Sequence, residues 1–272
     1  MKWVLITGCS SGIGRALVGA FRAAGWGVVA TARNPERLAE LGPGPDLRIL
    51  ALDVTDAASI CAAVAACSDL DLTALVNNAG YGQMGPLELL KSEELRTQLE
   101  TNVIGLHAVT VAFLPLLRKN SGARIVHIAS VLGRLSIPMA GAYNASKHAV
   151  VALGETLRVE IGREIPVILV EPGSVRTEFR NTLVNAWGDL PKRAEGTPYH
   201  AAIDTYRRQR EAFAAEHGLP AEACAQRIVR AVNARRPPRR LVVGSDSYWG
   251  QVAHRILPAW LFEAFLRRTY GL

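Results

Sequence analysis

The chain has 272 residues, of which 49% are hydrophobic, and its formal net charge is +7. That length allows one large domain or two small ones, and the composition is ample for a sizeable core. No uninterrupted apolar run approaches the roughly 18 residues of a membrane span, and the N-terminus has no signal-peptide pattern, so we expect a cytoplasmic protein.

The first predicted elements are a short apolar strand at 4–7, a glycine-rich turn and an amphipathic helix that ends near Ala24. The turn reads Gly8-Cys9-Ser10-Ser11-Gly12-Ile13-Gly14. Strand, turn and helix in this order begin a Rossmann unit, in which glycines let backbone N–H groups approach a pyrophosphate at the helix N-terminus. A tight turn without a ligand is the alternative, because the common fingerprint is spaced Gly-x-Gly-x-x-Gly instead.

The second strand, at 28–33, ends in Ala32-Arg33. An NAD-binding unit usually ends this strand with Asp or Glu, which holds the ribose 2′-hydroxyl. An arginine suits a 2′-phosphate instead. We therefore expect NADP(H) rather than NAD(H), with Ser10 as a second donor to the phosphate. A solvated arginine in a helix-capping loop is the alternative.

Five more strands are predicted at 47–52, 72–76, 124–129, 167–170 and 240–244, with helices at about 36–41, 55–67, 92–118 and 141–162 between them. Strands that alternate with helices predict an α/β fold, a doubly wound parallel sheet of about seven strands in one domain over residues 1–272. Ligands bind such sheets outside the C-terminal strand ends. At those ends stand Gly8, Arg33, Asp53, Asn77, Ser130 and Pro172.

Tyr143 and Lys147 lie four residues apart, so on a helix they share one face. A phenol has an unperturbed pKa of about 10, and a fixed ammonium group nearby lowers that pKa. The pair could therefore exchange a proton with an alcohol or a carbonyl. Taken alone, the spacing is far more typical of a half-exposed helix pair. Asn102, inside the helix at 92–118, is a polar residue that needs its own explanation.

Together these residues resemble the short-chain dehydrogenase/reductase family in its single-domain branch, from Trp3 to about Phe179. The motifs follow in that family's order: Thr7-Gly8-x-x-x-Gly12-x-Gly14, Asn77-Asn78-Ala79-Gly80, Asn102, Ser130, Tyr143-x-x-x-Lys147 and Pro172-Gly173. Within the family, the segments 7–14, 30–33 and 171–179 are similar to the 17β-hydroxysteroid and retinol dehydrogenase-like group.

The resemblance implies roles for four catalytic residues. Tyr143 would be the general acid or base, and Ser130 would hydrogen-bond the substrate oxygen. Lys147 would hold the nicotinamide ribose and lower the pKa of Tyr143, and Asn102 would bind a water that links Lys147 to solvent. Cofactor contacts are implied for Gly8, Ser10, Ser11, Gly12, Ile13, Gly14, Arg33, Asp53, Val54, Asn77, Ala79, Gly80, Tyr143, Lys147, Pro172, Gly173, Val175 and Thr177. Family members often form homodimers or homotetramers through the helices that hold Asn102 and Tyr143.

The resulting hypothesis is an NADP(H)-dependent oxidoreductase that interconverts a secondary alcohol and a ketone. A cofactor-binding sensor without chemistry is the alternative, but it would not need the complete set of catalytic residues. An epimerase or dehydratase of the longer family branch would need more chain after Thr177 than is present. The four cysteines form no Cys-x-x-Cys or Cys/His cluster, which argues against a metal site.

Two segments lie outside the motifs. The excursion at about 178–218, with predicted helices at 178–187 and 200–217, follows the sixth strand and is typical of a lid or substrate loop. The tail at about 248–272 has an apolar helix face between basic ends. It could pack on the domain, pair with another subunit, lie on an anionic membrane surface or cover a substrate. Both segments favour a bulky apolar substrate, such as a steroid or retinoid.

Basic residues crowd into the last third of the chain, at 207–208, 235–236, 239–240 and 267–268. No interleaved aromatic platform or nucleic-acid motif accompanies them, so we interpret them as solvated helix faces and loops rather than a nucleic-acid site.

Overall fold

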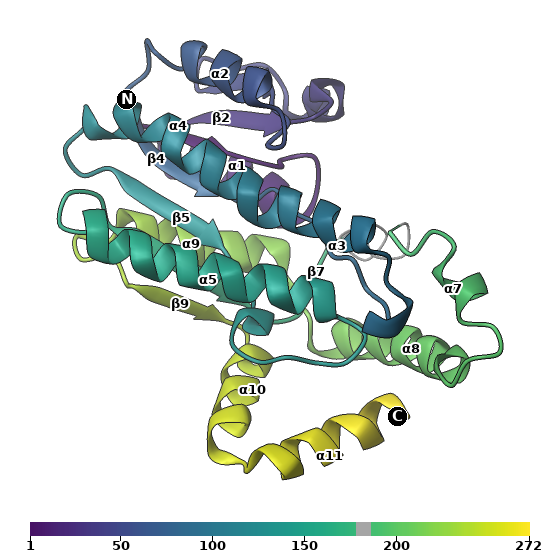
Figure 1. The fold of residues 1–272 in the computed structure, drawn as a ribbon. Coiled ribbons are helices and arrows are strands. Elements are labelled where there is room, and N and C mark those ends of the chain that lie inside the picture. Colours follow the sequence, from purple (N-terminus) through teal and green to yellow (C-terminus); the bar gives the residue numbers. More distant parts are fainter. Residues whose placement is uncertain (178–185) are drawn as a thin grey trace.

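The computed structural model describes residues 1–177 and 186–272, and for residues 209–217 the backbone alone. Its main sheet has seven parallel strands in the order β3-β2-β1-β4-β5-β6-β9. The doubly wound parallel sheet predicted from the sequence is confirmed (Figure 1). The strands are β1 (Trp3–Ile6), β2 (Gly27–Ala32), β3 (Leu47–Ala51), β4 (Leu72–Asn77), β5 (Arg124–Ile128), β6 (Val167–Pro172) and β9 (Arg240–Val243).

Helices cover both faces of this sheet. On one face, α1 (Gly12–Ala23) packs beside α9 (Ala221–Asn233), and on the other lie α2 (Ala57–Ala65), α4 (Leu106–Arg118) and α5 (Gly141–Ile161) (Figure 1). Strand alternation explains the two cores. Val4 and Ile6 of β1 pack with Phe21 of α1, whereas Leu5 between them packs with Phe113 of α4.

The long helix expected at 92–118 is interrupted. It is divided into α3 (Ser92–Leu99), the π-helical turn η3 (Glu100–Gly105) and α4. By length and composition the run 92–118 could cross a membrane, which differs from the sequence-based expectation. Its buried side chains, however, pack against the sheet and α2, as in the core helix of a layered α/β fold.

The excursion leaves and re-enters the sheet between β6 and β9. Its two ends pair as the short parallel strands β7 (Val175–Arg176) and β8 (Leu219–Pro220), which were not predicted. Between them, α7 spans Leu190–Arg193 and α8 spans Tyr199–His217, as expected for the second helix of the excursion. The helix expected at 178–187 falls almost entirely outside the described residues.

The tail forms two helices, α10 (Ser245–Ile256) and α11 (Ala259–Tyr270), divided at Pro258 as predicted. Together they make an arm that extends from the end of the sheet and bends back beneath α8 (Figure 1). Short 3-10 turns complete the chain: η1 (Pro35–Leu41), η2 (Leu87–Leu89) and η4 (Val131–Gly133).

Candidate active site

The glycine-rich turn lies where β2 and β4 flank β1, at the point where the strand order reverses. Gly12 has a φ of +58°, which favours glycine. A side chain at Gly14 would collide with the Gly8 carbonyl and the Asn78 amide, so the turn closes tightly on itself. Ser11 is the N-cap of α1, and its side chain accepts no hydrogen bond from the first backbone N–H groups of the helix. The helix N-terminus is therefore suited to a phosphate.

Asn78 fixes this turn against β4. Its side-chain amide donates to the carbonyl oxygens of Thr7 (2.9 Å) and Gly8 (3.0 Å). The Thr7 hydroxyl in turn accepts from the backbone N–H groups of Asn78 and Ala79, both at 2.9 Å. Asn78 carries no role predicted from the sequence, although it stands within the Asn77–Gly80 motif. The ends of β1 and β4 are thus joined by side-chain bonds.

The Asn77 side chain turns beneath α4 rather than toward the glycine-rich turn, and the cofactor contact expected of Asn77 stays a prediction. Its amide nitrogen lies 2.9 Å from the Thr110 hydroxyl and 3.1 Å from His127 Nδ1. Asn77 is buried, and burial lowers the pKa of His127 to about 4. The Asn77 side chain therefore belongs to a neutral polar cluster beneath α4.

Arg33 directly follows β2, and Asp53 stands two residues after β3 at the same edge of the sheet. Asp53 accepts hydrogen bonds from the backbone N–H (2.9 Å) and hydroxyl (2.8 Å) of Thr55. These bonds, with the nearby charge of Arg33, hold the pKa of Asp53 below its usual range. Arg33 is exposed and, within the described part of the chain, makes no ion pair. The Arg33 guanidinium is therefore available at the position where a 2′-phosphate would be recognised. Val54, the next residue after Asp53, is buried against Gly105 of η3.

Ser130 follows β5 and caps η4. Its hydroxyl oxygen accepts from the backbone N–H of Leu132 at 3.1 Å, which leaves the hydroxyl proton available to a substrate oxygen. The turn packs closely on α5, because a side chain at Gly133 would meet the carbonyl oxygen of Lys147 at 2.7 Å. Local hydrogen bonding thus fixes Ser130 beside the helix that carries Tyr143.

Lys147 and Tyr143 are both buried on one face of α5. The Lys147 Nζ donates to the carbonyl oxygen of Ile128 at 2.8 Å and lies 5.6 Å from the centroid of the Tyr143 ring. Burial lowers the pKa of Lys147 to about 8. While charged, this ammonium group favours the phenolate form of a neighbouring tyrosine. The pair can therefore hold and move a proton near neutral pH.

Asn102 braces the first turn of α5 from the π-helical turn. Its amide donates to the carbonyl oxygen of Tyr81 (2.9 Å) and to the Ser146 hydroxyl (3.1 Å), and its oxygen accepts from the Tyr81 N–H (3.1 Å). The Ser146 hydroxyl in turn donates to the carbonyl oxygen of Tyr143 at 2.8 Å. The wide π turn thus presents Asn102 to α5, as such turns often do at functional sites.

Glu171, at the end of β6, is fully buried between two arginines. Its Oε1 accepts from Arg134 Nε at 2.9 Å and from Arg240 Nε at 3.1 Å, and Gln251 of α10 donates to its Oε2 at 3.1 Å. Burial raises the pKa of Glu171, but the hydrogen bonds from Arg240 and Arg134 outweigh that effect and lower it. Arg134 ends the turn that Ser130 begins. This clamp, which was not predicted from the sequence, therefore joins the Ser130 turn to β9 and the tail.

The segment after Pro172 crosses back over the glycine-rich turn. Asp246 of α10 accepts from the Ser174 N–H at 2.6 Å. A side chain at Gly12 would lie 3.2 Å from Thr177 Cβ, so Thr177 stands directly against the turn. Gly173 and Val175 belong to this same segment between Pro172 and Thr177. The contacts of Gly173 and Val175 with a nicotinamide stay predictions.

An apolar cluster includes the ring of Tyr143. It draws on the loop before η2, the segment between Ser130 and Tyr143, and the excursion. Its buried members are Met84, Leu132, Leu135, Met139, Ala140, Tyr143, Trp187, Leu190, Ala194, Ala202, Ile203 and Tyr206. Tyr270 of α11 packs against it, with its ring centroid 5.7 Å from that of Tyr206. The Tyr143 ring therefore lies among apolar side chains from distant parts of the sequence.

Comparisons with known proteins agree with this geometry. A family model described as short chain dehydrogenase matches residues 2–187. The NADPH-dependent 3-dehydrocapnine reductase of Ornithobacterium rhinotracheale is 32% identical over 277 residues, covering 95% of this chain and 93% of the relative. The 17-beta-hydroxysteroid dehydrogenase type 6 of Bos taurus is 32% identical over 284 residues, covering 99% and 89%.

Among solved structures, a short chain dehydrogenase/reductase from Burkholderia phymatum in complex with NAD has a TM-score of 0.79 and 30% identity, covering 92% of this chain and 91% of that one. The likeness to 17β-hydroxysteroid dehydrogenases that the motifs indicated is confirmed.

Proposed function

The chain belongs to the short-chain dehydrogenase family, and we propose that it is an NADP(H)-dependent oxidoreductase that interconverts a secondary alcohol and a ketone. The observation that carries this proposal is the burial of Lys147 and Tyr143 together on α5, with the ammonium nitrogen 5.6 Å from the ring centroid. A protein that only bound the cofactor would not need this desolvated pair beside Ser130.

The residues of the glycine-rich turn fit a dinucleotide. The space that a side chain at Gly14 would fill is already closed by backbone, and the α1 N-terminus is suited to the pyrophosphate. Arg33 would bind the 2′-phosphate, and Asp53 with Val54 would border the adenine. The NADPH dependence of the Ornithobacterium relative favours the same cofactor, whereas the Burkholderia structure contains NAD. Arg33 therefore decides the preference that we propose.

The nicotinamide of the bound cofactor supplies or accepts the hydride. In the reduction, Tyr143 donates its phenolic proton to the oxygen of the ketone, and Ser130 donates a hydrogen bond to that same oxygen. Lys147 stabilises the phenolate that remains and would hold the ribose. The bonds from Asn102 through Ser146 to the Tyr143 carbonyl oxygen keep this turn of α5 in place. In the oxidation, each proton moves in the opposite direction.

The substrate would be bulky and largely apolar, as the cluster around Tyr143 indicates. Trp187, Leu190 and Tyr206 are all buried there and come from the excursion. A substrate must displace or reorganise such side chains, and it replaces their contacts best with apolar surface of its own. A steroid- or retinoid-sized ketone has that surface, and a small polar ketone does not.

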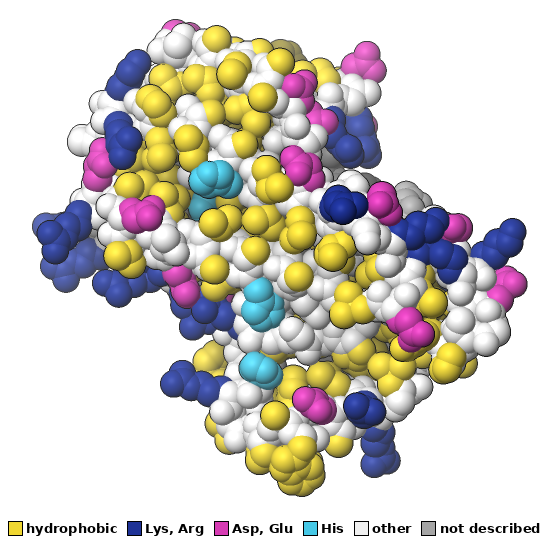
Figure 2. Space-filling model, in the orientation of Figure 1, with side chains coloured by type: hydrophobic (Ala, Val, Ile, Leu, Met, Phe, Trp, Pro, Cys, Tyr) yellow, Lys and Arg dark blue, Asp and Glu magenta, His cyan; other side chains and the backbone are white. Residues whose placement is uncertain are grey.

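A homodimer or homotetramer would pair through α4 and α5. Hydrophobic side chains gather over these helices on the face seen in Figure 2. Ile104 of η3, Val111 of α4 and Val159 of α5 are exposed by 52%, 50% and 87%. One domain over residues 1–272 and a cytoplasmic location remain our predictions.

A NADPH-oxidation assay with a graded panel of ketones tests the function. The panel runs from small polar ketones through acyl ketones to steroids and retinal. We expect ketone-dependent oxidation of NADPH, with kcat/KM rising as the apolar size of the ketone increases. Tight NADPH binding without turnover on any ketone or aldehyde would favour a cofactor-binding sensor and contradict the proposal. Preference for small polar ketones would refute its substrate half alone.

A further inference from the structure

We propose that the outer face of the arm formed by α10 and α11 docks on the surface of a membrane that contains anionic phospholipids. Among the described residues, twelve large hydrophobic side chains are exposed, and seven of them belong to residues 248–272. A surface patch this apolar on so short a segment is unusual for a protein that meets only water. The arm has two faces, and only the inner face contacts other described parts of the chain.

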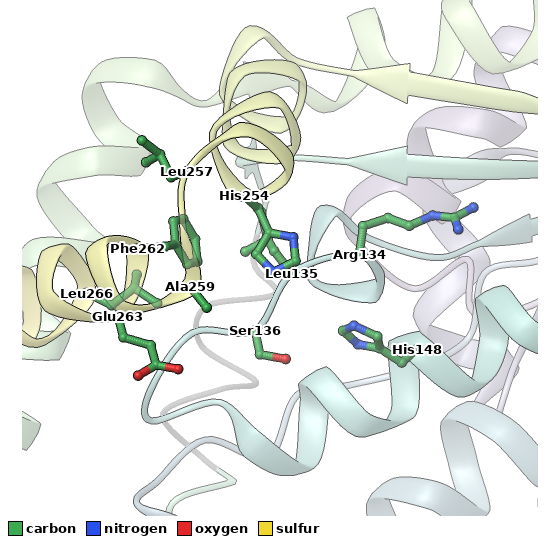
Figure 3. A pocket seen from close by; sticks show the side chains of 10 residues that line it. All are labelled: Arg134, Leu135, Ser136, His148, His254, Leu257, Ala259, Phe262, Glu263 and Leu266. Atoms are coloured by element: carbon green, nitrogen blue, oxygen red, sulfur yellow. The ribbon is translucent and has the colours of Figure 1, made fainter.

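The inner face of the arm packs on the body of the protein. Phe262 and Leu266 line a cavity of about 310 Å³ together with Leu135, Ser136 and His148, and Figure 3 shows His254 and Phe262 turned toward that space. Their rings also contact each other, with centroids 5.1 Å apart. These contacts account for the half-buried side of α11.

The outer face of α11 is apolar and aromatic as well. Trp260 is 71% exposed, Phe265 is 60% exposed and Leu261 is 40% exposed, and Ile256 at the end of α10 is 73% exposed. On a helix, Trp260 and Leu261 project away from Phe262 and Leu266, and Phe265 lies at the border between the two faces. Figure 2 shows the arm standing away from the body, with hydrophobic side chains along its lower edge. Packing within the chain does not explain this face.

The charges around the outer face are cationic. Arg255 precedes it, and Arg267 and Arg268 follow it on the last turn of α11, all three exposed. The acidic residues of the arm lie elsewhere: Glu263 lines the inner cavity and Asp246 accepts the Ser174 N–H. Aromatic and aliphatic side chains flanked by arginines are typical of helices that lie in the membrane interface, where the arginines meet lipid phosphates. This charge complementarity points to anionic lipid as the occupant.

The arm also adjoins the apolar cluster. Tyr270 contacts Tyr206, and Leu135 borders both the inner cavity and the cluster around Tyr143. An arm docked on lipid would hold the substrate side of the protein next to the bilayer. Lipid docking depends on the arm alone, whereas delivery of a membrane-dissolved apolar substrate rests on the proposed oxidoreductase function.

Vesicle flotation of the full-length protein tests the docking. The vesicles are pure phosphatidylcholine or an equal mixture with phosphatidylglycerol. We expect the wild type to float with the mixed vesicles. Trp260→Ser combined with Phe265→Ser should weaken that binding by about tenfold or more, because two large apolar groups no longer leave water. Leu87→Ser, which removes a similarly exposed apolar side chain from η2, outside the arm and outside the face proposed to pair, is the control and should bind like the wild type.

A charge variant separates the electrostatic contribution. Arg267→Gln combined with Arg268→Gln should weaken binding to the mixed vesicles by roughly fivefold per arginine, with little change on phosphatidylcholine alone. Arg235→Gln combined with Arg236→Gln changes the net charge equally at exposed sites outside the arm and should have no such effect. Melting temperatures check that every variant is folded.

Three results would overturn the proposal. The wild type could fail to float with either vesicle, or the arm variants could bind as tightly as their controls. The third is a wild-type dimer in light scattering that becomes a monomer in Trp260→Ser with Phe265→Ser and binds no lipid, which would assign the face to a second copy of the chain. Because flotation needs neither NADPH nor a ketone, its failure leaves the proposed oxidoreductase function untouched, and a failed ketone assay leaves the docking untouched.

Discussion

At the carboxyl ends of β1 to β4, the candidate cofactor side is made largely of backbone, whereas the candidate substrate side around Tyr143 is made of side chains. The glycine-rich turn is closed by its own carbonyl groups and fastened by Asn78. The apolar cluster draws Met84, Leu190 and Tyr206 from three separate parts of the chain. A backbone site is suited to one constant ligand, and a side-chain site can change with the substrate.

The pair Tyr143 and Lys147 connects the two sides, because Lys147 would hold the cofactor ribose and Tyr143 would donate a proton to the substrate. The buried Glu171 clamp lies behind it and fixes the Ser130 turn to β9 and the tail. A substitution in each region should therefore produce a different kinetic or thermodynamic signature. If the two sides were not functionally distinct, replacing Arg33 and replacing Tyr143 would change the same kinetic constants.

Replacing Lys147 by Ala should produce the largest loss, because this residue serves both sides. We expect kcat for ketone reduction to fall by about 10²–10⁴-fold, since the Tyr143 phenolate is no longer stabilised. NADPH should also bind more weakly, because Lys147 would hold the ribose. Steady-state kinetics and a fluorescence titration with NADPH measure the two effects. An unchanged NADPH affinity would place Lys147 on the substrate side alone.

Replacing Glu171 by Gln tests the clamp between the two sides. Removing one partner of a buried ion pair costs about 3–5 kcal/mol, and Glu171 loses two arginine partners at once. Glu155→Gln is the control, because that carboxylate is 44% exposed and pairs only with Arg134 among the described residues. It should cost no more than about 1 kcal/mol. Denaturant unfolding measures both variants.

The clamp also predicts a pH dependence. The arginines lower the pKa of Glu171 in the folded protein, so its stabilisation is complete above its ordinary value of 4.5 and declines as the pH falls below it. The stability difference between the wild type and Glu171→Gln should therefore shrink in acid. A difference that stayed constant from neutral to acidic pH would show that the carboxylate charge is not what matters.

Replacing Arg33 by Ala should alter the cofactor side alone. A charge-assisted hydrogen bond contributes roughly 1.5–3 kcal/mol, so the preference for NADPH over NADH should fall by about ten- to a hundredfold. Affinity for NADH and KM for the ketone should stay near their wild-type values. Arg230→Ala, at an exposed position on α9, is the matched control. Equal affinities of the wild-type protein for NADPH and NADH would contradict the assignment before any variant is made.

The smallest expected effect is the change of kcat/KM for NADPH with pH. Burial lowers the pKa of Lys147 to about 8 in the cofactor-free protein, so this group is charged below that pH and neutral above it. Reduction uses the charged form, and kcat/KM for NADPH reports the pKa values of the free enzyme. We expect it to decline above about pH 8 by at most roughly tenfold per pH unit. A flat profile through this range would separate Lys147 from the proton transfer.

The sequence predicted the sheet and the candidate catalytic residues because both depend on local patterns. Strand periodicity and the helical spacing of Tyr143 and Lys147 need no knowledge of distant residues. The Glu171 clamp could not be found that way, since Arg134 and Arg240 are 106 positions apart in the printed sequence. The direction of the Asn77 side chain was within reach. It alternates with Val76 along β4, which turns it toward α4 and away from the glycine-rich turn.

The π turn that carries Asn102 was also beyond prediction. Nothing in the residues around Asn102 marks an interruption, since Pro115, the helix-breaking residue of the segment 92–118, lies further on inside α4. The wider turn coincides with tertiary bonds from Asn102 to Tyr81 and Ser146. The apolar cluster shares this limit, because its members become neighbours only after folding. The likeness of the segments 7–14 and 171–179 to hydroxysteroid dehydrogenases, by contrast, was visible in the motifs.

The most direct test of the account is Tyr143→Phe, with NADPH binding and ketone-dependent NADPH oxidation measured on one preparation. The phenol hydroxyl is the only group removed, so the fold and the cofactor side should be unchanged. We predict wild-type NADPH affinity and a kcat lower by about 10²–10⁴-fold, the usual contribution of general acid catalysis. Turnover close to that of the wild type would contradict the assignment of Tyr143 as the proton donor.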